Sequence, residues 1–146
     1  MRKVKLAETD QEIDERFAVM AQLRPHLVRE KFVQRVRRQQ EQGFRLAFVE
    51  DSGAVVAVAG FRLMEMLSGG RTLYVDDLIT DEARRSRGHG KELLRWLQRY
   101  AREAGCETFS LDSGTHRQEA HAFYFREGMR VTGFHFATKM AERVGQ

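Results

Sequence analysis

The sequence has a single cysteine, a single proline and no long hydrophobic run. One cysteine excludes a disulfide within the chain, and one proline excludes a proline-rich linker. No apolar stretch approaches the roughly 18 residues of a membrane-spanning helix, and charged residues begin at Arg2. We therefore expect a soluble, cytoplasmic protein that makes no contact with a membrane.

A strong excess of charge of one sign is also missing. The 25 basic and 21 acidic residues leave a net charge of +4, which is too small to indicate nucleic-acid binding from composition alone. The basic residues are nevertheless concentrated, since residues 84–102 contain seven of them against the single acidic Glu92. This cluster indicates either a site for an anion or a solvated helix face.

The 146 residues, 42% of them hydrophobic, are enough for one hydrophobic core. No internal repeat, low-complexity tract or linker divides the chain. We therefore expect a single domain over residues 1–146.

The first part of the chain shows helical signals followed by strand signals. A capping-box spacing at residues 9–12 and apolar residues at helical intervals predict a helix that stops before Pro25. A second apolar stripe predicts a helix within residues 27–43. Residues 45–50 and 54–61 are β-prone runs joined by a short glycine-containing link, which predicts a hairpin. Two helices are thus expected to precede any strand.

The second part predicts strands that alternate with helices. Residues 73–80 form an apolar run, 90–104 an amphipathic helix, and 107–112 a strand. A further helix within 115–127 and a long final strand over 130–140 follow. A strand-helix-strand unit favours parallel pairing, so the fold class is α/β of the α+β type, with a mixed central sheet flanked by helices.

A glycine-containing loop at residues 85–90 separates the apolar strand from the amphipathic helix. Its glycines let the backbone approach a ligand, and the N–H groups and dipole at a helix start suit a pyrophosphate. A nucleoside-triphosphate loop would need Ser or Thr after Lys91, where Glu92 stands. A dinucleotide fingerprint would need glycine at Leu93, so both of these readings fail.

Arg85, Gly88 and Gly90 match a loop of Gln or Arg, two residues, Gly, one residue, then Gly or Ala. In this, and in the order of its elements from residue 13 to residue 140, the chain resembles the GNAT superfamily of N-acetyltransferases. The resemblance implies the GNAT fold, with helices on both faces of the sheet, and acetyl-CoA as co-substrate. It implies that the pyrophosphate is bound by Arg85, Ser86, Arg87, Gly88, His89, Gly90 and Lys91, and that the pantetheine arm is bound by main-chain groups of Leu78, Ile79 and Thr80.

Residues 120–128 resemble the late Ala-x-x-x-Tyr-x-x-x-Gly segment of the same superfamily. The resemblance implies that Tyr124 is the general acid that protonates the departing CoA thiolate. The alternative for Tyr124 is an aromatic side chain that only fills the core. Family members often carry Asn where this chain has Arg117, which implies a charge-assisted contact to pantetheine in its place.

Asp76 and Asp77 are candidates for the general base, because a carboxylate in an apolar strand is costly unless it is paired or used. Strict alternation places Asp77 on the face of Leu73 and Val75, and Asp76 on the opposite face. Either reaches the cleft if the strand bulges, as strands in this family do. A structural ion pair, a water relay and an acceptor that is already neutral are the alternatives.

Metal and cysteine chemistry are not expected. His116 and His121 are five residues apart, off a common helical face, and no cysteine or carboxylate completes a metal site. Cys106 stands at a helix-to-strand junction without an evident base, so it is interpreted as packing. Direct acetyl transfer in a ternary complex is therefore predicted.

The predicted partner is the amine acceptor, a small molecule or a peptide, whose identity the sequence does not reveal. Residues 23–26 and 64–70 are candidate linings of its site. GNAT proteins often dimerise, so a homodimer is considered as well. Two alternatives stay open: a CoA-binding regulatory module without turnover, and a nucleic-acid-binding protein that uses the basic helix over residues 91–102.

Overall fold

The computed structural model describes residues 2–85 and 87–140 of the chain. They form two compact units, one within Met1–Leu111 and the other within Asp112–Gln146. The expectation of one domain over residues 1–146 stays a prediction.

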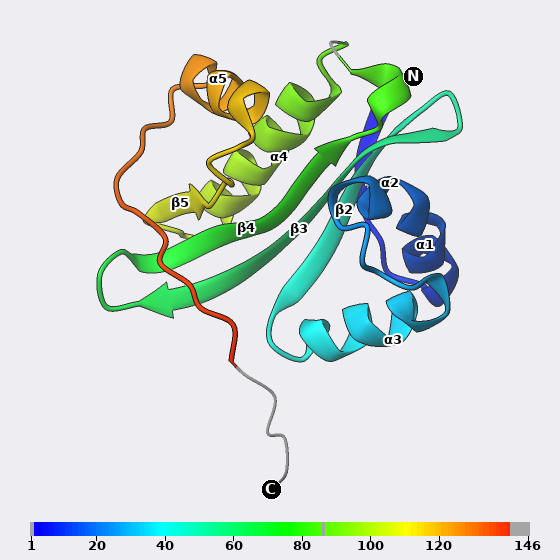
Figure 1. The fold of residues 1–146 in the computed structure, drawn as a ribbon, viewed down its shortest axis with the longest axis horizontal. Coiled ribbons are helices and arrows are strands. Elements are labelled where there is room, and N and C mark those ends of the chain that lie inside the picture. Colours follow the sequence, from blue (N-terminus) through cyan, green and yellow to red (C-terminus); the bar gives the residue numbers. More distant parts are fainter. Residues whose placement is uncertain (1, 86, 141–146) are drawn as a thin grey trace, which may run out of the picture. The chain divides into compact units, whose positions relative to one another are not determined.

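The first unit is built on a five-stranded sheet with the strand order β1-β2-β3-β4-β5 (Figure 1). The first three pairings are antiparallel, and β4 pairs with β5 in parallel. The sheet is therefore mixed, as predicted. The strands are β1 (Arg2–Leu6), β2 (Phe44–Asp51), β3 (Ala54–Met66), β4 (Gly70–Thr80) and β5 (Thr108–Leu111).

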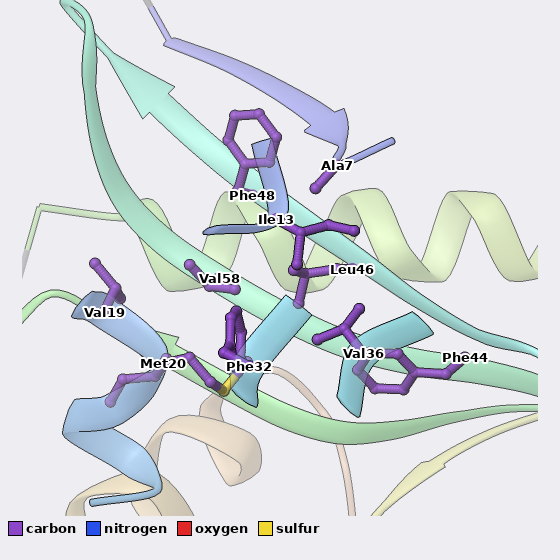
Figure 2. Close-up of a cluster of buried hydrophobic side chains, with 11 residues drawn as sticks. Ala7, Ile13, Val19, Met20, Phe32, Val36, Phe44, Leu46, Phe48 and Val58 are labelled. Carbon is purple, nitrogen blue, oxygen red and sulfur yellow. The ribbon is translucent and has the colours of Figure 1, made fainter. Parts of the chain in front are cut away.

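Helices pack on both faces of this sheet. On one face, the helices α1 (Asp10–Glu15), α2 (Phe17–Leu23) and α3 (Arg29–Gln40) enclose the apolar cluster that Figure 2 shows. On the other face, α4 (His89–Glu103) buries Leu93 and Leu97 against the sheet. The predicted mixed sheet with helices on both faces is confirmed.

The connection between β4 and α4 begins with a short 3₁₀ turn, η1 (Glu82–Arg84). Asp81 caps it, because its Oδ1 accepts a hydrogen bond from the backbone N–H of Ala83 at 3.2 Å. This turn brings the chain from the end of the strand toward the glycine loop before α4.

The first predicted helix is two helices. Its capping box is confirmed, since Thr9 Oγ1 accepts from the N–H of Glu12 at 3.1 Å while the Glu12 carboxylate accepts from the N–H of Thr9. The helix then breaks at Arg16, which is only 3% exposed and whose guanidinium stacks 3.5 Å from the centre of the Phe48 ring. The break lets α1 and α2 each bury apolar residues in the same cluster.

The expectation that two helices precede any strand is wrong, because β1 opens the fold at the edge of the sheet. Its charged Lys3 and Lys5 are exposed, while Val4 and Leu6 pack partly against the core. A five-residue edge strand depends on its neighbour for its hydrogen bonds, so its own sequence carries little signal.

In the second unit, α5 (Gln118–Arg126) forms where a helix was predicted. The predicted strand over residues 130–140 is wrong: these residues form no strand, and Val131, Phe134, Phe136 and Met140 are all exposed. A strand is stabilised by pairing with a neighbour, and the described part of this unit contains no strand that could pair with it.

Candidate active site

A β-bulge in β4 determines the orientation of its two carboxylates. Across β3, Phe61 pairs with Val75 and Gly60 pairs with Asp77, so Asp76 is an extra residue without a partner in β3. An extra residue reverses the alternation of side chains beyond it. As a result, Asp76 and Asp77 line the same pocket.

The placement of Asp77 by strict alternation is therefore wrong, and the bulge that was named as its alternative is present. Leu73 and Val75 pack on the side of α4, whereas Ile79 beyond the bulge packs on the side of α1–α3.

Gly60 makes room for this arrangement. A Cβ atom on Gly60 would lie 2.5 Å from Cζ of Phe44 and 2.7 Å from Oδ2 of Asp77. Any side chain here would push away the aromatic ring or the carboxylate. The position of β3 that pairs with Asp77 therefore requires glycine.

The Asp76 carboxylate is held by Arg62 of β3. Nε of Arg62 lies 3.0 Å from Oδ1 and 3.1 Å from Oδ2, and Nη2 donates a further hydrogen bond to Oδ2. This hydrogen bonding to Asp76 raises the pKa of Arg62, although burial acts in the opposite direction. A carboxylate gripped in this way suits a positioning role.

Among the described residues, only one oxygen of the Asp77 carboxylate accepts a hydrogen bond. Nε of Arg24 donates to its Oδ1 at 2.8 Å, and Nη2 of Arg24 donates to the backbone carbonyl of Asp76 at 3.0 Å. Burial raises the pKa of the Asp77 carboxyl, while the hydrogen bond from Arg24 acts in the opposite direction. Its pKa is thus moved toward neutral pH, as a general base requires.

The pocket in front of these carboxylates has a volume of about 280 Å³. Its walls come from α2, α3 and their connection, and its floor from β2 and β4. Two segments were predicted to line the acceptor site. Residues 23–26 contribute Arg24 and His26 to this pocket, whereas residues 64–70 contribute no lining residue. The lining residues are Met20, Arg24, His26, Leu27, Phe32, Arg35, Val36, Gln39, Phe44, Leu46, Tyr74, Asp76 and Asp77.

Strand β4 extends beyond its parallel partner. β5 pairs with Thr72–Val75 only, and β4 continues to Thr80. The three residues that were predicted to bind pantetheine, Leu78, Ile79 and Thr80, lie in this extension. Because the side chain of Ile79 is buried in the core, that residue offers a ligand only its main chain.

The predicted loop leads into α4 at Gly88. Gly88 is the N-cap residue and adopts φ +81°, a left-handed conformation that favours glycine. It has no side chain to cap the helix, so the N–H groups of the first turn are available to an anion. Arg85, Arg87 and Lys91 are exposed around this turn, and Ser86 lies outside the described residues.

His89 follows as the first residue of α4, and Gly90 as the second. The His89 ring is buried, and neither of its nitrogens has a hydrogen-bond partner within residues 2–85 and 87–140. A buried polar ring without a partner beside a helix start is consistent with a ligand that supplies the missing contact.

The second unit carries Tyr124 and Arg117. Tyr124 is half-buried in α5, with its ring centre 5.3 Å from that of Phe123, and Arg117 is the N-cap residue of the same helix. Burial raises the pKa of the Tyr124 hydroxyl, and the charge of Arg117 opposes this change. The hydroxyl therefore keeps its proton at neutral pH, as a general acid requires.

Cys106 is a half-buried free thiol between α4 and β5, and it packs against the core on the α4 side. Among the described residues, no three His, Cys, Asp or Glu side chains are grouped so that they could hold a metal ion. Over the same residues, no helix combines the length and the apolar character needed to cross a membrane.

Sequence reasoning did not single out Gly60, Arg35 or Arg62. Arg62 directly follows the apolar run 54–61, and an arginine at that place pairs naturally with a carboxylate on the next strand. Arg35 gives no local signal, because it is one of several arginines in α3.

Comparisons with known proteins agree on one family. The sequence model of the Acetyltransferase (GNAT) family matches residues 8–129. An uncharacterized N-acetyltransferase of Bacillus subtilis, YhdJ, is 33% identical over 125 residues, which cover 85% of this chain and 88% of that protein. An aminoalkylphosphonate N-acetyltransferase of Salmonella typhimurium is 36% identical over 62 residues, 42% of this chain and 40% of that protein.

Among solved structures, an aminoglycoside N-acetyltransferase in complex with CoA superposes with a TM-score of 0.83. The match covers 96% of this chain and 95% of the other, at 13% sequence identity. At this identity, the similarity shows that the two proteins share a fold.

Proposed function

Because the chain belongs to the GNAT acetyltransferase family and is an acetyl-CoA-dependent N-acetyltransferase, we propose that it transfers the acetyl group directly to a primary amine in a ternary complex. The observation that carries this proposal is the pocket beside the bulge, where Asp77, with its raised pKa, faces an open space. The pocket volume and the name of the Salmonella relative both support a small amine.

The residues at the start of α4 fit acetyl-CoA, which supplies an activated thioester when it is bound. The first-turn N–H groups, Arg85, Arg87, Gly88, His89, Gly90 and Lys91 surround the proposed pyrophosphate site, to which Ser86 is added on sequence grounds. Gly88 allows the backbone to approach closely because it has no Cβ. Main-chain groups of Leu78, Ile79 and Thr80 would hold the pantetheine arm, with Arg117 as an additional contact.

Asp77 is the proposed base, and Tyr124 the proposed acid. Asp77 takes the proton that the amine loses as its nitrogen bonds to the acetyl carbon, and Tyr124 gives a proton to the sulfur as the carbon–sulfur bond breaks. In this scheme Asp76 has a positioning role. Arg62 fixes its carboxylate, and its backbone carbonyl accepts a hydrogen bond from the same Arg24 that donates to Asp77.

The acidic limb of the pH profile should report Asp77. We expect kcat/KM to fall as the pH drops through the pKa of Asp77, which is raised above its ordinary value of 3.8, because the protonated carboxyl cannot accept a proton. Asp77→Asn should remove this limb and lower kcat/KM about 10²-fold at neutral pH, with water as the base for the remaining rate. Initial rates between pH 4 and 9 measure both effects.

Asp76→Asn is the comparison for this experiment. If Asp76 only positions its neighbour, its variant keeps the acidic limb at a reduced rate. If the acidic limb of the pH profile disappears in Asp76→Asn and persists in Asp77→Asn, Asp76 is the base and Asp77 is not.

Thiol release from acetyl-CoA, measured across a panel of primary amines, tests the activity itself. Direct transfer predicts that Cys106→Ala releases thiol at the wild-type rate, because no bond to Cys106 is formed. Mass spectrometry of the wild-type protein, quenched with acetyl-CoA, should show no acetylated cysteine. Acetyl trapped on Cys106, together with an inactive variant, would contradict direct transfer, and binding of acetyl-CoA without release to any amine would favour a regulatory module.

A further inference from the structure

The charges around the pocket do not cancel. Each carboxylate already has its own arginine, Arg24 for Asp77 and Arg62 for Asp76. These four side chains form two neutral pairs. The remaining charged group in the lining is the guanidinium of Arg35, and the imidazole ring of His26 lies there as well. The surplus charge that faces a ligand is therefore positive.

The packing of α3 places Arg35 at the wall of the pocket, where its side chain is exposed. Phe32 and Val36 on the same helix are each 4% exposed and fasten it to the apolar cluster. Gln39 stands one turn beyond Arg35 and lines the pocket beside it. Within the described part of the chain, the guanidinium of Arg35 has neither an ion pair nor a hydrogen bond. Its donors are available to a ligand.

The volume limits what this ligand can be. Pockets for drug-sized molecules begin at about 300 Å³, and this one has about 280 Å³. A short acceptor that reaches Asp77 with its amine and Arg35 with another group fits this volume.

We propose that the acceptor is a short primary amine with a compact anionic group, a phosphate, phosphonate or carboxylate, and that Arg35 binds the anion. This inference rests on the proposed function, and it names the substrate class of the same site. The planar fork of Arg35 can make two parallel hydrogen bonds to such an oxygen group, and the Gln39 amide can donate a third. A second ammonium group would be repelled by the same arginine.

The test compares amines that differ only at the far end: phosphoethanolamine, beta-alanine, ethanolamine and ethylenediamine. We expect kcat/KM to be highest for one of the two anionic amines, and the contrast between these two separates phosphate from carboxylate. Arg35→Gln should lower the ratio of kcat/KM for phosphoethanolamine to kcat/KM for ethanolamine at least about tenfold, the usual effect of losing a hydrogen bond between charged groups. The KM for acetyl-CoA should not change.

Two variants control for charge and for folding. Arg35→Lys should keep part of the preference, since it retains the charge and loses the fork. Arg38→Gln removes an arginine from the exposed face of α3 outside the pocket, and should leave the ratio unchanged.

Calorimetry of phosphoethanolamine and ethanolamine without acetyl-CoA gives a second readout, independent of turnover. If phosphoethanolamine binds more tightly than ethanolamine and Arg35→Gln abolishes this difference, the inference is supported even when no amine is acetylated. The absence of acetylation would then contradict only the proposed function. Acetylation of ethanolamine or ethylenediamine in preference to both anionic amines would overturn the inference and leave the proposed function intact. Equal effects of Arg35→Gln and Arg38→Gln on the ratio would overturn it as well.

Discussion

Replacing Tyr124 with phenylalanine should lower kcat for acetyl transfer about 10²–10³-fold, with little change in the affinity for acetyl-CoA. Phenylalanine keeps the ring and its contact with Phe123, and removes only the hydroxyl. Burial raises the pKa of this hydroxyl, so it is protonated and ready to donate at neutral pH. Steady-state kinetics on a good acceptor, with acetyl-CoA affinity measured by calorimetry, would separate the two quantities.

Tyr100→Phe is the matched control. Tyr100 is a half-buried tyrosine of α4 whose ring packs edge-on against Phe61, with the centres 5.2 Å apart, and it has no role in the proposed chemistry. Its variant loses the same atom and should keep the wild-type kcat. If Tyr124→Phe is equally active, Tyr124 only fills space, and water protonates the thiolate.

Replacing Gly88 with glutamate should abolish the stabilisation of the protein by acetyl-CoA. At 100 times its dissociation constant, a ligand stabilises the native state by about 2.7 kcal/mol, which for a chain of this size raises the melting temperature by roughly 10 °C. In the variant, a carboxylate stands at the start of α4, where it repels the pyrophosphate and blocks the close approach of the backbone. Differential scanning fluorimetry with and without acetyl-CoA measures the shift.

Gly105→Glu separates this effect from backbone strain. Gly88 and Gly105 flank the two ends of α4, and both have a positive φ, +81° and +76°. Both variants should lose about 1–2 kcal/mol of stability without ligand, because side chains are strained in this conformation. A Cβ atom on Gly105 would have nothing within 4 Å, so its variant should keep the full acetyl-CoA shift. A folded Gly88→Glu protein with an undiminished shift would refute the assignment of the loop.

The start of α4 could be predicted from the sequence because its signals are local. An amphipathic stripe specifies the helix, and Gly88 before it permits the left-handed N-cap that the structure shows. The capping box of α1 and the hairpin of β2 and β3 are local in the same sense. Within the site, this reasoning reached the loop at residues 85–91 and the two carboxylates of β4.

The side on which Asp77 lies could not be predicted in this way. A bulge depends on which residue of β3 pairs with which residue of β4, and a shift by one position moves a side chain to the other face. Arg24 is 53 residues from Asp77 in the chain, and Arg62 is 14 residues from Asp76. Patterns among neighbouring residues therefore reveal neither ion pair.

By itself, the sequence determined the helices with their own caps and stripes, the glycine loop and the residue types available for acid–base chemistry, because these depend on neighbours a few residues apart. Only the tertiary structure decided that β1 is a strand and that residues 130–140 are not, because strand formation depends on a partner. It also decided that two neutral ion pairs lie beneath a pocket with Arg35 at its wall. The charged groups at that pocket come from α3, β3, β4 and the connection between α2 and α3, which only folding brings together.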